Sequence, residues 1–71
     1  MVDLDRLKRI IDDSGITMVA VAKKTGILRE TLYNRLAGRG EFTVSEVESI
    51  SEVFHLSGQE RDDIFFAKQV E

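Results

Sequence analysis

One glycine in the middle of the chain constrains the fold more than any other residue. Gly26 separates two short helical patterns in the stretch VAKKTGILRETLYNRLAG, residues 21–38. In a unit that begins at Met18, Ala22 is the fifth residue, Gly26 the ninth and Leu32 the fifteenth. A small fifth residue lets two helices approach closely, glycine permits a sharp turn, and a branched fifteenth residue fills the angle between the helices. Because a plain helical hairpin needs none of these at fixed offsets, the spacing favours a helix-turn-helix of the DNA-binding type.

Helix start and stop signals predict three short helices in the first half of the chain. Asp3 and Thr17 are suitable N-caps, and glycines end the apolar patterns at Gly15, Gly26 and Gly38. Between these signals, apolar side chains recur at helical spacing. The expected helices cover residues 4–13, 18–24 and 28–37.

The second half of the chain carries two capping-box signals, each of which marks the start of a helix. Thr43 and Glu46 form the first box, and Ser57 and Glu60 form the second. The last helix is expected to carry three apolar residues: Ile64, Phe65 and Phe66. Five short helices joined by short connections predict an all-α fold, a compact five-helix bundle.

The composition limits how the chain can be stabilised and where it acts. Its 71 residues include no cysteine, so the core depends on apolar side chains without disulfides or thiolate metal sites. The longest purely apolar run, MVAVA, is too short to span a membrane. We therefore expect one cytoplasmic domain, residues 1–71, that binds neither a cofactor nor a metal.

Charge is divided unevenly along the chain, although the net charge is only −3. Residues 1–16 carry a net charge of −1, residues 17–40 carry +4 and residues 41–71 carry −6. Net positive charge is thus confined to the helix-turn-helix segment. Two interpretations stay open from charge alone: a set of solvated helix faces, or a surface that faces an anion such as nucleic acid.

The stretch TMVAVAKKTGILRETLYNRLAGRGEF resembles the helix-turn-helix of small phage repressors and Cro proteins, the lambda-repressor-like (XRE-type) class. The tail IFFA is similar to that of short regulators from prophages of Gram-positive bacteria. The resemblance implies a phage or prophage transcription regulator that binds operator DNA, with the third helix in the major groove. Such proteins bind as two-fold dimers on half-sites about 34 Å apart, so a homodimer is also implied.

Carried over residue by residue, the base-reading positions of the family fall on Arg29, Glu30 and Asn34, with Thr31 as a further member. Arg29 suits a bidentate contact to guanine, Glu30 can accept from the amino group of cytosine, and Asn34 can pair with adenine. An exposed helix face needs polar residues in any case, and Glu30 is equally suited to a local ion pair. The residues assigned to the DNA backbone are Thr17, Met18, Lys23, Lys24, Tyr33, Arg35 and Arg39.

Two residues depart from the family pattern and open an alternative. Met18 stands where the family usually has glutamine, and Leu28 where serine or threonine caps the recognition helix. Methionine cannot donate to a phosphate, and leucine cannot cap. With Val19, these residues indicate a small Cro-like antirepressor that binds a repressor protein instead of DNA. Phe66 is a separate candidate for a protein contact, in a dimer or with the tail, because Phe65 and Phe66 cannot both point inward. The alternative for Phe66 is packing against the first helix.

The sequence offers no constellation suited to catalysis. One histidine and no cysteine leave no nucleophile–base pair and no metal cluster. His55 is expected at the end of the fourth helix, where it would interact with the helix dipole. The adjacent carboxylates at 12–13 and 62–63 face different ways on a helix. We therefore do not expect an enzyme.

Overall fold

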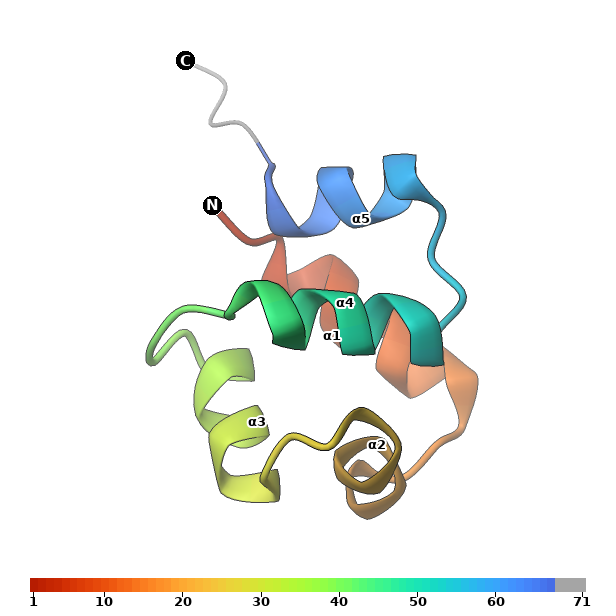
Figure 1. The fold of residues 1–71 in the computed structure, drawn as a ribbon, viewed down its shortest axis with the longest axis vertical. Helices are drawn as coiled ribbons and strands as arrows, with labels where there is room; N and C mark the ends of the chain where they lie inside the picture. The colour runs from red at the N-terminus through yellow and green to blue at the C-terminus, as the bar shows by residue number, and fades with distance from the viewer. Residues whose placement is uncertain (68–71) are drawn as a thin grey trace.

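The computed structural model describes residues 1–67, whose arrangement is shown in Figure 1. Residues 1–67 form five α-helices and contain no strand. The helices are α1 (Leu4–Ser14), α2 (Met18–Thr25), α3 (Arg29–Leu36), α4 (Val44–Val53) and α5 (Gly58–Phe65). The predicted all-α class is confirmed, and the predicted bounds of the first three helices differ from those observed by one residue at most. Within residues 1–67, no helix combines the length and apolar character needed to cross a membrane.

Local side-chain caps explain why four of the five helices begin where they do. Asp3 and Thr17 each accept a hydrogen bond from the backbone N–H three residues later, at 3.1 and 3.2 Å. Both predicted capping boxes are present, at the starts of α4 and α5. In the second box, the Ser57 backbone N–H that donates to Glu60 lowers the pKa of this carboxyl group, and the Ser57 hydroxyl contributes. In the described chain, only α3, which follows Leu28, begins without a side-chain cap.

The core draws apolar side chains from all five helices and from the turn after α2. Its buried members are Leu7, Ile11, Val21, Ile27, Leu32, Leu36, Val47, Ile50, Ile64 and Phe65. The central helix α4 packs against α2 and α5, while α2 also packs against α3, and α1 against α5. In Figure 1, α4 runs across the middle, with α5 and the N-terminus at one end and α2 and α3 at the other. The helix-turn-helix pair thus occupies one end of the bundle.

Just after α4, a residue other than glycine adopts the left-handed backbone conformation. His55 follows this helix with φ of 53°, and its N–H donates to the Glu52 carbonyl at 3.3 Å. The Leu56 N–H donates to the Ser51 carbonyl at 2.9 Å, which completes a Schellman motif. Histidine therefore occupies a position where glycine is usual, and this placement carries backbone strain.

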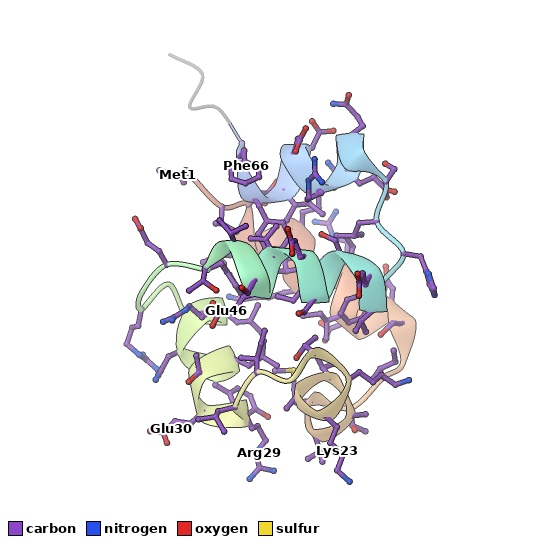
Figure 2. All side chains as sticks on the ribbon, viewed as in Figure 1. Met1, Lys23, Arg29, Glu30, Glu46 and Phe66 are labelled. Carbon is purple, nitrogen blue, oxygen red and sulfur yellow. The ribbon has the colours of Figure 1, made fainter. Side chains whose placement is uncertain are left out.

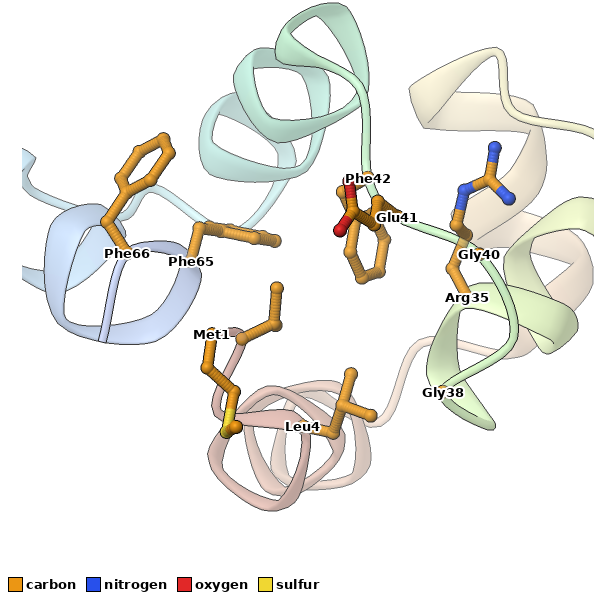
Figure 3. Close-up of a pocket in the computed structure, with 10 residues that line it drawn as sticks. Met1, Leu4, Arg35, Gly38, Gly40, Glu41, Phe42, Phe65 and Phe66 are labelled. Carbon is orange, nitrogen blue, oxygen red and sulfur yellow. The ribbon is translucent and has the colours of Figure 1, made fainter. Parts of the chain in front are cut away.

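The two phenylalanines at the end of α5 have opposite environments. The Phe65 ring is buried and packs edge-to-face on Phe42, with centroids 5.4 Å apart. Phe66 is 59% exposed and lines the rim of a hollow with Met1 and Leu4 (Figure 3). The prediction that only one of the two phenylalanines points inward is confirmed. Most of the Phe66 surface is open rather than covered by α1.

Candidate nucleic-acid interface

The turn between α2 and α3 has the geometry that its residue spacing predicts. Gly26 adopts φ of 75°, and its N–H donates to the Ala22 carbonyl at 2.9 Å. Leu32 is fully buried between the helices. The turn is further held by Thr25, a buried residue whose hydroxyl donates to the Val21 carbonyl at 2.8 Å and accepts the N–H of residue 27 at 3.2 Å. These contacts fix the angle at which α3 leaves α2.

The exposed side of α3 brings together three of the four candidate base-reading residues. Arg29, Glu30 and Asn34 line one shallow hollow with Leu28 and Tyr33. Residues 30, 33 and 34 are three and four apart, so they share one face of the helix. Figure 2 shows Arg29 and Glu30 pointing away from the body of the molecule at the end formed by α2 and α3. The buried Leu32 and Leu36 anchor the opposite side of the helix, so that the polar face stays outside.

Thr31 lies apart from that group. It is half-buried and lines a different hollow, which is shared with the turn after α2 and with the start of α4 at Thr43 and Ser45. Thr31 is three residues before Asn34, so the helix alone does not separate the two; the start of α4, which lines the hollow beside Thr31, does. Thr31 therefore stands at the side of the exposed face.

The residues assigned to the DNA backbone have different environments. Four of them have exposed side chains on or beside the helix-turn-helix: Lys23, Lys24, Tyr33 and Arg39. Lys23 extends outward at the same end of the molecule as Arg29 (Figure 2). Thr17 is exposed, but its hydroxyl already caps α2. Met18 is partly buried and packs against the core. The exposed cations of this set therefore come from α2 and from the loop after α3.

Arg35 differs from the other cations because it has a structural partner. Its Nε atom donates to Glu46 Oε1 at 3.3 Å, and the two side chains are only 23% and 16% exposed. The same Oε1 atom accepts the Thr43 N–H at 2.9 Å in the capping box of α4. The loop approaches closely at Gly40, where an added Cβ atom would collide with the Arg35 guanidinium. Arg35 thus ties α3 to the start of α4, a role that the sequence analysis did not identify.

Asn34 and Arg39, treated separately in the sequence analysis, are joined in the structure. Arg39 Nε and Nη2 donate to Asn34 Oδ1 at 3.3 and 3.2 Å. The Arg39 backbone N–H also donates to the Asn34 carbonyl at 2.8 Å. The spacing of five residues together with Gly38 is the signal that could have predicted this pairing, because a glycine after a helix folds the next residue back onto its last turn.

The apolar residues proposed for a protein contact do not form one surface. Leu28 is 76% exposed and Val19 is 48% exposed, whereas Met18 is partly buried. Phe66 lies at the opposite end of the molecule from Arg29, the residue that follows Leu28 (Figure 2). Phe66 therefore belongs to a separate region.

Comparison with known proteins assigns the family. A family model for helix-turn-helix proteins, the XRE-type or lambda-repressor-like class, matches residues 7–60, which is more than half of the chain. The chain therefore belongs to this helix-turn-helix family, whose members are DNA-binding regulatory proteins. No curated protein and no solved structure gives a significant match to the chain.

Proposed function

We propose that this protein is a Cro-like transcription regulator of a phage or prophage, which acts in the cytoplasm and binds operator DNA through α3. The observation that carries the proposal is the exposed face of α3, where Arg29, Glu30 and Asn34 line one hollow while Leu32 on the other side is fully buried. A rigidly anchored helix with hydrogen-bonding side chains on its free face suits the major groove of DNA.

Each residue of this face has a distinct role in the proposal. Arg29 contacts guanine through its two-donor fork, Glu30 accepts from the amino group of cytosine, and Asn34 contacts a purine. Thr31 contributes at the side of the face, next to the start of α4. The exposed residues Lys23, Lys24, Tyr33 and Arg39 hold phosphates, while Thr17 and Met18 lie at the start of α2 beside the DNA backbone, where Met18 offers no donor. Arg35 can reach a phosphate only in competition with Glu46.

A homodimer is the second part of the proposal. One small module buries too little surface for tight specific binding, and two copies related by a two-fold axis would read half-sites about 34 Å apart. Phe66 supports this part, because it is 59% exposed at the end of the molecule away from Arg29 (Figure 2). In this arrangement residues 1–71 act as one domain, and Phe66 contacts the second copy.

The experiment is selection of bound duplexes from a random DNA pool at moderate salt. The wild-type protein is expected to enrich a palindromic site. Arg29→Ala should lose that enrichment, while Lys8→Ala should keep it, because Lys8 is an exposed cation beside Met1 at the other end of the molecule. Failure of the wild-type protein to enrich any sequence, with no rescue by Met18→Gln, would contradict the proposal.

A second function is favoured by the exposure of Leu28 and Val19. A leucine that is 76% exposed at the start of α3 suits the centre of a protein interface with charged residues at its rim. In this alternative the protein is an antirepressor that binds a phage repressor and not operator DNA. It predicts that Leu28→Thr abolishes co-elution with the repressor, whereas the DNA-binding proposal predicts that Leu28→Thr retains selection of the palindrome.

A further inference from the structure

We propose that Asn34 and Arg39 act as one unit that selects guanine in the major groove. The inference rests on the proposed function, because it concerns the same face of α3. It changes the base expected at this position, since an isolated asparagine pairs best with adenine.

The backbone holds the two residues together. α3 ends in a Schellman motif: Gly38 adopts φ of 83°, its N–H donates to the Arg35 carbonyl at 3.1 Å, and the Arg39 N–H donates to the Asn34 carbonyl at 2.8 Å. Because this motif places Arg39 beside the last turn of the helix, the two side chains meet without a long-range contact. The Arg39 guanidinium is therefore positioned before any DNA is bound, which reduces the conformational entropy lost on binding.

The hydrogen bonds determine what Asn34 can offer to a base. Its side-chain oxygen has two lone pairs, and it accepts from both Nε and Nη2 of Arg39, at 3.3 and 3.2 Å. The acceptor of the carboxamide is thus occupied by one guanidinium. The Nδ2 group of Asn34 keeps its two donors, and Arg39 keeps the three N–H donors that it does not use here. Together the two side chains present only donors.

A surface of donors matches one purine better than the other. Guanine presents two acceptors in the major groove, N7 and O6, whereas adenine presents one acceptor, N7, and one donor, the N6 amino group. Adenine would place its amino group against donors, so one of its hydrogen bonds would be unmade. Guanine can accept from Asn34 and Arg39 at both positions. The pair therefore favours guanine over adenine.

The test measures base preference rather than affinity alone. The base position that belongs to the pair is the one whose preference is lost in Asn34→Ala when duplexes are selected from a random pool. The wild-type protein is expected to prefer guanine there by about tenfold, the discrimination of one good base contact. Arg39→Ala frees Asn34 Oδ1, so it should shift the preference at this position to adenine. Arg39→Lys keeps the charge but lacks the two-donor fork, so it should restore affinity without restoring the guanine preference.

Lys24→Ala is the matched control, because Lys24 is another exposed cation of the helix-turn-helix. It should weaken binding to all sequences alike and leave the guanine preference unchanged. If Arg39→Ala also weakens all sequences alike, Arg39 contacts only the DNA backbone and the inference is overturned, while the proposed function stands. If the wild-type protein enriches no sequence, both are overturned.

Discussion

Replacing Leu28 by threonine should stabilise the protein, because it would supply the cap that α3 lacks. Thr17 and Thr43, which cap α2 and α4, have φ of −70° and −77° and ψ of 156° and 163°. Leu28 has φ of −58° and ψ of 137°, close to the values of the two capping threonines, so a threonine there requires only a small change of the backbone. A threonine there would accept a hydrogen bond from the N–H of Thr31, three residues later, as Thr17 does from its own helix.

The expected gain follows from the cap and from the exposure of Leu28. A serine or threonine at the N-cap contributes about 1 kcal/mol relative to an apolar residue, with a range of about 0.5–2 kcal/mol. Leu28 is 76% exposed, so its removal forfeits little buried apolar surface. The free energy of unfolding should therefore rise by about 1 kcal/mol. In a domain of this size, that corresponds to a rise in Tm of about 4–8 °C.

Urea denaturation followed by far-UV circular dichroism measures this change. Leu28→Thr should raise the midpoint at an unchanged m-value. Leu28→Ala removes the same exposed side chain without supplying a cap, so it should change stability by less than about 0.5 kcal/mol. Thr17→Leu makes the opposite exchange on α2 and should lower stability. If Leu28→Thr is no more stable than Leu28→Ala, a threonine at this position does not cap α3.

Three further predictions concern the ends of α4 and α5. Glu46→Gln keeps a capping side chain but removes the charge facing Arg35, so it should lower the free energy of unfolding by about 1 kcal/mol. In a double-mutant cycle this loss should shrink in an Arg35→Gln background; equal losses in both backgrounds would show that the pair contributes nothing. His55→Gly relieves the strain of the left-handed conformation at φ of 53°, so it should raise the free energy of unfolding by about 0.5–1 kcal/mol, as measured by thermal unfolding. A lower free energy of unfolding would show that the histidine side chain stabilises the turn. Folding lowers the pKa of Glu60. The ionised Glu60 carboxylate therefore stabilises the folded protein at pH values above the pKa that this group has in the unfolded chain. This stabilisation is lost as the pH falls through the lower pKa of the folded state. Glu60→Gln should therefore lose less stability than the wild type on acidification, as measured by urea midpoints across the acid range, and parallel profiles would contradict this.

The features that the sequence predicted correctly depend on residues close together in the chain. A capping box needs only two residues three apart, so Thr43 with Glu46 identified the start of α4 without knowledge of its neighbours. Gly26 identified the turn for the same reason, since its left-handed conformation is a local requirement. The fully buried position of Leu32 followed from its fixed offset from this turn.

The features that the sequence did not predict depend on how the helices lie in space. The contact of Arg35 with Glu46 joins residues eleven positions apart, and it exists because the start of α4 lies beside α3. Burial of Ile27 depends in the same way on the path of the turn through the core. The candidate face was predicted as four base-reading residues, and the separation of Thr31 from the others became visible only when α4 was in place. Sequence patterns identify a polar helix face, but the neighbouring helices determine how much of it is open.

The central claim is that α3 reads a specific DNA sequence, and a ratio of dissociation constants tests it most directly. Fluorescence anisotropy at one fixed salt concentration would compare the selected palindrome with a scrambled duplex of the same length and composition. We expect the wild-type protein to bind the palindrome at least about 10³-fold more tightly. Arg29→Ala should reduce this ratio by about tenfold or more for each half-site that loses its Arg29 contact, chiefly by weakening binding to the palindrome. Equal dissociation constants of the wild-type protein for the two duplexes would show that α3 does not read a specific sequence.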